Sequence, residues 1–202
     1  GRSNAPKKKR VGGSSPPIAT NLNLKQNIIM ETNFKELKEE IIKRAKAADA
    51  CTSEYKRAYK SESFEELLQV IKDNFDFAVR RKVIDIELIK LYENEFNNNK
   101  IYGNIDISEG YLLVDNATVR AWGNATVRAW GNATVEAWGN ATVEASGNAT
   151  VEASGNATVR ASDSATVEAS GNATVRASGN ATVEAWGNAT VEASGNATVR
   201  AS

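Results

Sequence analysis

Apolar residues recur at alternating spacings of three and four along the first half of the chain, which is the pattern of amphipathic helices. One such stripe contains Phe34, Leu37 and Ile41, and it is preceded by Asn33 and Glu36, which can form a capping box. This pattern predicts a helix over residues 33–49.

Two further stripes follow. Ser63 and Glu66 form a second possible capping box at the start of the next apolar stripe, and Asn97-Asn98-Asn99 follows the last one as a stop. The two stripes contain Phe64, Leu67, Leu68, Ile71 and Phe75, and then Ile84, Leu88, Leu91, Tyr92 and Phe96. Residues 50–62 either add a short helix or extend the first one.

From Asp115 onward the pattern changes to an eight-residue repeat, eleven units of which run without insertion to Ser202. Within a unit such as GNATVEAW, small apolar and polar residues alternate, which predicts a strand with one buried face. The Gly-Asn pair between strands tolerates the backbone of a tight corner. Repetition at a fixed period predicts a parallel β-solenoid with a core of alanine and valine.

The number of octads in one coil is open at this point. Two octads per coil bring small side chains together across a thin interior, whereas three would leave a triangular interior that Ala and Val fill poorly. The tryptophans favour three, because Trp122, Trp130 and Trp138 would then form one complete coil. We prefer the 16-residue coil on packing grounds.

These patterns divide the chain into four segments. We expect a disordered leader over residues 1–29, a helical head over 30–100, a transition strand over 101–114 that caps the solenoid, and the octads over 115–202. The predicted fold class is α+β, with a small helical N-terminal domain followed by a parallel β-solenoid. No cap follows the last octad, so we expect its coil to pair with a second copy or a partner; a frayed last coil is the alternative.

The leader has the marks of an expression tag. Pro6 to Val11 reads PKKKRV, and Gly-Gly-Ser-Ser follows as a flexible spacer. The basic run resembles the monopartite nuclear-localisation signal of a polyomavirus large T antigen, with one basic residue fewer. That resemblance implies that Lys7, Lys8, Lys9 and Arg10 bind importin; a solubilising tail is the alternative.

Charge and composition exclude several kinds of chemistry. The 25 basic and 25 acidic residues cancel, but residues 1–29 carry six basic and no acidic side chains, so the rest of the chain is mildly acidic. With no histidine and one cysteine, a His/Cys metal cluster, a Ser–His or Cys–His pair and a disulfide framework are excluded by counting. We expect no cofactor and no enzyme activity, since the remaining acids, lysines and tyrosines form no catalytic pattern. Cys51 is expected to be a buried or incidental thiol.

Two groups of residues are candidates for binding a partner. Four tryptophans occupy octad positions where the other octads have serine, so the repeat does not require them: Trp122, Trp130, Trp138 and Trp186. They are interface anchors, or the first three pack against the head. Arg80, Arg81 and Lys82 form the one dense basic cluster outside the leader, but acidic neighbours and the lack of interleaved aromatics make direct nucleic-acid binding unexpected. No membrane association is expected either, because no apolar run approaches the roughly 18 residues of a membrane span.

Residues 30–202, with helices followed by octads of the GNATVEAW type, resemble uncharacterised proteins of phages and gut bacteria. The resemblance brings no catalytic residues with it. Together with the nuclear-type leader, it implies a phage-encoded, non-enzymatic inhibitor of a bacterial CRISPR nuclease, cytoplasmic in a bacterial host and nuclear in a eukaryotic cell with this leader. The competing hypothesis is a structural protein whose solenoids self-assemble.

Overall fold

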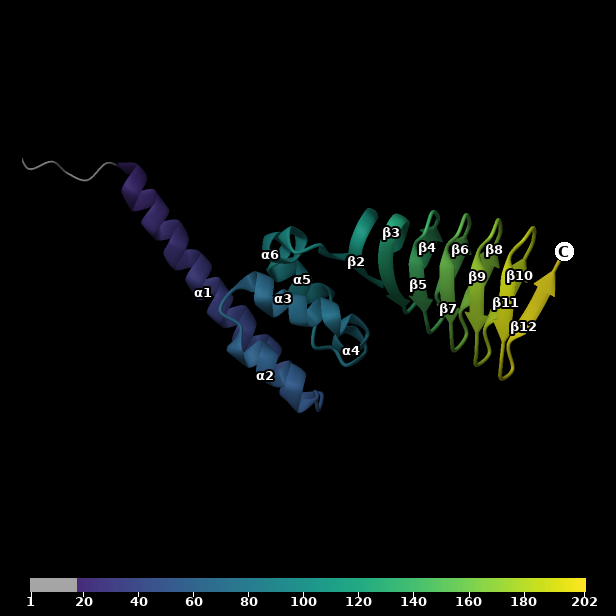
Figure 1. Cartoon of the computed structure of the whole chain (residues 1–202), viewed down its shortest axis with the longest axis horizontal. Helices are drawn as coiled ribbons and strands as arrows, with labels where there is room; N and C mark the ends of the chain where they lie inside the picture. The colour runs from purple at the N-terminus through teal and green to yellow at the C-terminus, as the bar shows by residue number, and fades with distance from the viewer. Residues whose placement is uncertain (1–17) are drawn as a thin grey trace, which may run out of the picture. The chain divides into compact units, whose positions relative to one another are not determined.

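A computed structural model describes residues 18–202, and Figure 1 shows their helices and strands in chain order. The chain divides into two compact units, Gly1–Glu36 and Leu37–Ser202. Helix α1 (Ile18–Ala47) crosses this division. Its last turns belong to the second unit, together with the other helices and strands described below.

Helix α1 begins earlier than the sequence predicts. It starts at Ile18 rather than at Asn33, so residues 18–29, expected in a disordered leader, are helical. No glycine or proline lies between Ile18 and Asn33, so nothing in this stretch stops the helix from extending toward its N-terminus. The predicted stripe is confirmed in the second unit, where Leu37, Ile41 and Ala45 are buried.

Three helices follow α1: α2 (Thr52–Lys60), α3 (Phe64–Asp73) and α4 (Phe75–Arg80). The ambiguous segment 50–62 therefore forms a separate helix. The predicted cap at Ser63 is confirmed, because its hydroxyl accepts a hydrogen bond from the Glu66 backbone N–H at 3.2 Å. The Glu66 carboxylate accepts from the N–H of Glu62, at 2.8 Å, rather than from that of Ser63.

The third predicted helix is two short ones, α5 (Ile86–Leu91) and α6 (Glu93–Asn98). The break lies at Tyr92, whose φ of −120° and ψ of 41° are not helical. The break buries Tyr92 and leaves Leu91, predicted to lie in the apolar stripe, 73% exposed. The asparagine run ends α6 as predicted. Among residues 18–202, no helix is both long and apolar enough to cross a bilayer.

The solenoid begins with strands that carry larger side chains than the octads. β1 (Ile101–Gly103) pairs in parallel with β2 (Ile107–Asp115), and β2 pairs with β3 (Thr118–Trp130). Helix α5 packs on β1, and the ring of Phe75 in α4 lies 5.0 Å from that of Tyr111 in β2. The helices therefore cover the first coil.

The predicted 16-residue coil is confirmed by the strand register. Thr118 pairs with Thr134, and Thr126 pairs with Thr142, so each strand lies beside the strand two octads away. Figure 1 shows the resulting stack of short strands. The strands after β3 have four residues each: β4 (Thr134–Ala137), β5 (Thr142–Ala145), β6 (Thr150–Ala153), β7 (Thr158–Ala161), β8 (Thr166–Ala169), β9 (Thr174–Ala177), β10 (Thr182–Ala185), β11 (Thr190–Ala193) and β12 (Thr198–Ala201).

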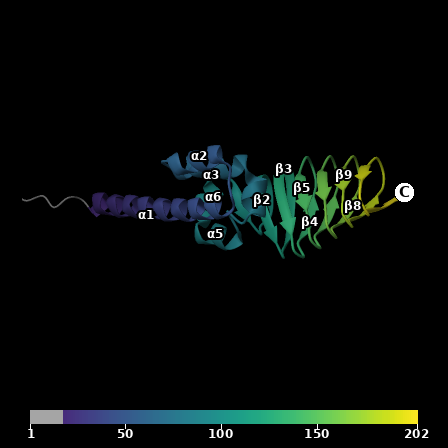
Figure 2. The same ribbon diagram turned by 90° about the horizontal axis from the view of Figure 1, so that it is seen from below.

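The coil has two faces, seen edge-on in Figure 2. Strands β5, β7, β9 and β11 form the odd face, and strands β4, β6, β8, β10 and β12 form the even face. The long strand β3 contributes residues to both. Between the faces lies a core of alanine and valine that is fully buried from Val119 to Ala185.

The corners hold successive coils very close together. Gly139 has a φ of 71°, and a Cβ there would lie 3.0 Å from the backbone nitrogen of Gly123. At the opposite corner, Asp163 takes the same octad position as these glycines, with a φ of 56°. Its carboxylate accepts a hydrogen bond from the N–H of Gly147 at 3.2 Å, a contact that offsets the unfavourable backbone conformation.

Candidate protein-interaction surfaces

The outward residue between valine and the second alanine of each octad forms one charged row on each face. On the even face the row is Arg120, Glu136, Glu152, Glu168, Glu184 and Arg200; on the odd face it is Arg128, Glu144, Arg160, Arg176 and Glu192. Opposite charges that are neighbours in register form ion pairs in all five cases. The two faces differ in their neighbours of like charge. The even face has four consecutive glutamates, and the odd face has two consecutive arginines.

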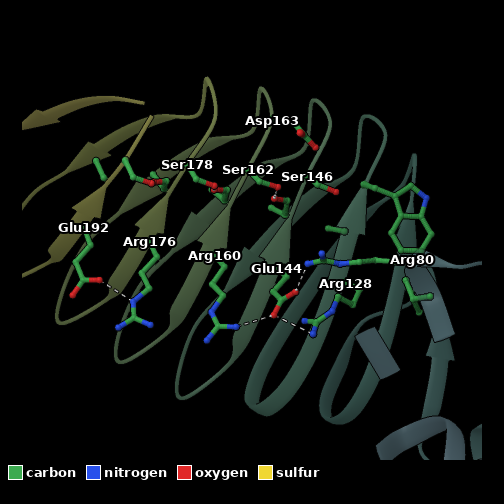
Figure 3. Close-up of a pocket in the computed structure, with 18 residues that line it drawn as sticks. Arg80, Arg128, Glu144, Ser146, Arg160, Ser162, Asp163, Arg176, Ser178 and Glu192 are labelled. Atoms are coloured by element: carbon green, nitrogen blue, oxygen red, sulfur yellow. Dashed lines mark hydrogen bonds and ion pairs between the residues drawn. The ribbon is translucent and has the colours of Figure 1, made fainter. Parts of the chain in front are cut away.

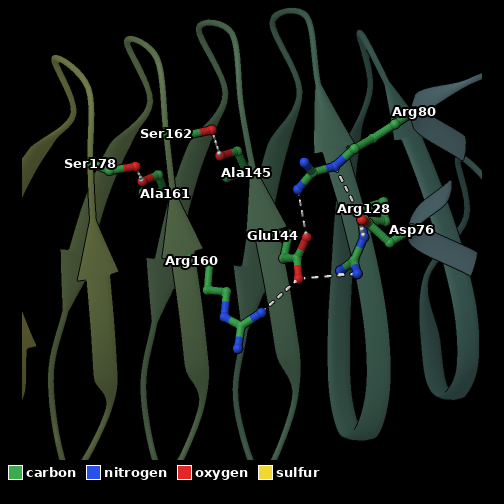
Figure 4. Close-up of polar contacts among 9 residues, drawn as sticks. All are labelled: Asp76, Arg80, Arg128, Glu144, Ala145, Arg160, Ala161, Ser162 and Ser178. Carbon is green, nitrogen blue, oxygen red and sulfur yellow. Dashed lines mark hydrogen bonds and ion pairs between the residues drawn. The ribbon is translucent and has the colours of Figure 1, made fainter.

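The odd face is joined to helix α4 through Arg128, whose side chain is only 13% exposed. Its Nε donates to Asp76 at 3.1 Å, and its Nη2 lies 3.1 Å from Glu144 (Figure 4). Arg80 bridges the same two carboxylates, at 2.7 Å from Asp76 and 3.3 Å from Glu144. Arg160 approaches Glu144 from the next coil, at 3.4 Å. Three arginines therefore surround two carboxylates where the helices meet the solenoid.

This network changes the interpretation of the predicted basic cluster. Arg80 is engaged within the chain, whereas Arg81 and Lys82 are exposed and form no ion pair within residues 18–202. Lys82 has a φ of 54° in the turn after α4. The three residues therefore differ, since Arg80 pairs with carboxylates of this chain and its two neighbours do not. Lys7, Lys8, Lys9 and Arg10 lie outside the described residues.

A groove of about 810 Å³ runs along the odd face. Figure 3 shows two lines of side chains in it: Ser146, Ser162 and Ser178 form one, with Asp163 beyond them, and the other contains Arg128, Glu144, Arg160, Arg176 and Glu192. Two arginines of the groove, Arg160 and Arg176, are neighbours in register. Each of the two also contacts a glutamate, so this face is close to neutral.

The tryptophans lie at both corners of the coil. Trp122, Trp138 and Trp186 share one corner, and the rings of the first two are stacked with centroids 5.6 Å apart and planes 10° apart. This pairing at a step of 16 explains why the three-octad argument from the tryptophans is wrong. Trp130 lies at the other corner, where it is half-buried and lines the odd-face groove.

Trp138 and Trp186 are the exposed members of the set, at 38% and 41%. Between them on the even face lies a slot of about 230 Å³, lined also by Ser154, Ser170 and three carboxylate residues. The carboxylates are those of Glu136, Glu152 and Glu168. Of the predicted binding residues, these two tryptophans are the ones that the structure places together on an open surface.

The single thiol lies next to the start of a helix, near Ser53 and Glu54. Cys51 is exposed, which excludes the buried thiol of the two expected alternatives, and it precedes α2 as the N-cap. A hydrogen bond with the Ser53 hydroxyl, 3.4 Å away, lowers the pKa of this thiol. Within residues 18–202, no three acidic or cysteine side chains gather as a metal site would require.

Sequence reasoning missed both the slot and the Arg128 network. The 16-residue step by itself places Arg128 opposite Glu144, so this pair could have been found from spacing. The contribution of Asp76 depends on how α4 packs on the solenoid, which no local pattern indicates.

Comparison of the chain with family models, curated proteins and solved structures finds no match to any of them.

Proposed function

We propose that this chain is a non-enzymatic protein-binding protein in which the solenoid is a rigid scaffold and its exposed tryptophans contact a partner. The partner class is a bacterial CRISPR nuclease, and binding inhibits it. This class rests on the resemblance to phage and gut-bacterial proteins and on the nuclear-type leader, not on chemistry in the site.

The observation that supports protein binding is the exposure of Trp138 and Trp186 on a scaffold that does not need them. Seven octads have serine at this position, and their strands have the same backbone register. Large exposed aromatic side chains cost solubility and are common anchors of protein interfaces. Their retention on the surface therefore favours a binding role.

Capture of purified nucleases tests this proposal. The full chain would be immobilised and exposed to a panel of purified CRISPR nucleases, with the double variant Trp138→Ser, Trp186→Ser in parallel. Serine is the residue of the other octads, so the fold should be preserved, which circular dichroism checks. Tyr59→Ser removes an exposed aromatic residue of α2 and is the matched control.

We expect one nuclease to be retained and inhibited by the unaltered chain and by Tyr59→Ser, with retention reduced at least tenfold in the double variant. Failure of every nuclease in the panel to bind would overturn the inhibitor proposal. Equal retention by the double variant would show that the tryptophans are not the anchors.

A self-assembling scaffold is the second candidate, favoured by the exposure of the last described coil. Val199 is 39% exposed, while the equivalent valines from Val119 to Val183 are buried. Strands β11 and β12 each pair on one side only within residues 18–202. If a second copy covers them, the mass measured by light scattering should increase with concentration, and Val199→Lys should abolish the increase.

A further inference from the structure

The slot on the even face is bounded by two aromatic rings. Trp138 and Trp186 lie three coils apart at the same corner, which is about 14 Å at the usual spacing of strands. The two coils between them carry Ser154 and Ser170 at that position. Because serine is so much smaller than tryptophan, the corner is hollow between the rings.

One wall of the slot is held in place before anything binds. The ring of Trp138 is stacked on that of Trp122, with the planes 10° apart. One face of Trp138 is thus covered, and its other face lines the slot. A fixed aromatic wall reduces the conformational entropy that binding would cost.

One side of the slot is a row of glutamates, only some of which are paired with an arginine. Glu136, Glu152, Glu168 and Glu184 are consecutive neighbours in register. The outer two are paired with Arg120, at 3.5 Å, and with Arg200, at 3.3 Å. Among the side chains that the structure describes, Glu152 and Glu168 have no ion pair or side-chain hydrogen bond.

The fold does not require this arrangement. At the same octad position on the odd face, the neighbour of Glu144 in the next coil is Arg160, which forms an ion pair with it at 3.4 Å. Like charges directly opposite each other on adjacent strands destabilise a sheet. An external cation would relieve the repulsion between Glu152 and Glu168, so their charge is complementary to a basic occupant.

We propose that the slot between Trp138 and Trp186 binds arginine side chains from an extended basic segment of a protein partner. A guanidinium group stacks on the open face of a tryptophan and donates paired hydrogen bonds to the carboxylates of Glu152 and Glu168. The proposal rests on the proposed function only in taking the partner to be a protein. Nucleic acid is disfavoured, since its phosphates would face the glutamates.

Peptide titration followed by calorimetry tests the slot directly. The probe is acetyl-(Gly-Arg)₃-amide, compared with the same peptide containing lysine or aspartate. The chain used carries glutamine at Lys7, Lys8, Lys9 and Arg10, so that its own basic residues do not compete. The variants are Trp186→Ser, the double variant Glu152→Gln, Glu168→Gln, and the control Glu192→Gln on the odd face.

We expect saturable binding of the arginine peptide, several-fold weaker binding of the lysine peptide and none of the aspartate peptide. The double glutamine variant should weaken binding at least tenfold and Trp186→Ser about fivefold, with less than a twofold change in the control. No saturable binding, or equal affinity for the double glutamine variant, would overturn the proposal.

Failure of the slot and failure of the proposed function are distinguishable. If the arginine peptide does not bind but a nuclease is still captured through the tryptophans, the slot proposal falls and protein binding stands. If the peptide binds as expected but no protein of the panel is captured, the slot stands and the inhibitor proposal falls.

Discussion

The helices and the solenoid within Leu37–Ser202 build their cores in opposite ways. The helical core joins large side chains that are far apart in sequence, among them Leu37, Ile84 and Phe96, and each occupies a place of its own. The solenoid core repeats alanine and valine in register from coil to coil. A unique core fails when one part is lost, whereas a repeated core is damaged locally, because each coil contacts only its neighbours.

The largest effect is expected in the helical core. Phe96→Ala should lower the free energy of unfolding by about 3–5 kcal/mol, because a fully buried aromatic side chain leaves a cavity. Urea denaturation followed by circular dichroism measures this. Leu91→Ala is the control, since its side chain is largely exposed, and should change stability by less than about 0.5 kcal/mol. Equal effects of the two would contradict the break at Tyr92.

A smaller effect is expected in the solenoid core, where one position can be compared between coils. Val151→Ala should cost about 2 kcal/mol, because two methyl groups are lost from a closed interior. Val199→Ala makes the same change at the same octad position in the partly exposed last coil, and should cost less than half as much. A cost at position 199 equal to that at 151 would mean that the last coil is covered in solution.

The ion-pair network between α4 and β3 connects the two cores. Arg128→Ala should lower stability by about 1–2 kcal/mol, because Asp76 loses a charged partner and Glu144, which is poorly exposed, loses another. Differential scanning calorimetry should then show the helical and solenoid transitions separating. Arg160→Ala removes an exposed arginine from the same network and should change stability by less than about 1 kcal/mol. A single unbroken transition in Arg128→Ala would show that the apolar contacts suffice.

The smallest effect is a dependence on pH in the helices. The hydrogen bond from Arg57 lowers the pKa of Asp73, and that from Arg44 lowers the pKa of Glu40. A carboxyl group whose pKa is lower in the folded state stabilises the fold above its unfolded pKa. That contribution is lost as the pH falls through the folded pKa. The helical signal should therefore unfold at lower urea concentration at about pH 2.5 than at about pH 5.5.

Asp73→Asn separates this contribution from general acid denaturation. Asparagine cannot titrate, so the difference between the two pH values should be smaller in this variant than in the unaltered chain. An unchanged difference would mean that the bond between Arg57 and Asp73, 2.7 Å in the structure, contributes nothing measurable to stability.

How far the sequence predicts the structure also differs between the two regions. In the octads one local rule, alternation of small apolar and polar residues, is repeated often enough to determine the strands, the corners and, with packing, the 16-residue coil. In the helices, by contrast, each boundary depends on its own local residues, and no repetition strengthens the signal. The capping box at Asn33 lies within α1 rather than at its start, and the break at Tyr92 accompanies the burial of that residue.

The candidate surfaces show the same limit. The tryptophans stand out in the sequence because they depart from the repeat, but their spacing did not indicate that Trp122 and Trp138 stack. The slot depends on two rows that lie side by side, one in which tryptophan and serine share a position and one of glutamates. The contact between Asp76 and Arg128 depends on tertiary packing that no sequence pattern encodes.

Because consecutive octads alternate between the two faces, the number of repeats carries information that the repeat unit does not. Loss of one octad, such as Gly147–Ser154, would leave every corner and the core chemically intact. It would nevertheless transfer all later residues to the opposite face, moving Trp186 to the corner of Trp130. Repetitive genes gain and lose units easily during replication. In this protein only the gain or loss of an even number of octads would keep every later residue on its own face, so selection on binding would appear as a repeat count that stays odd.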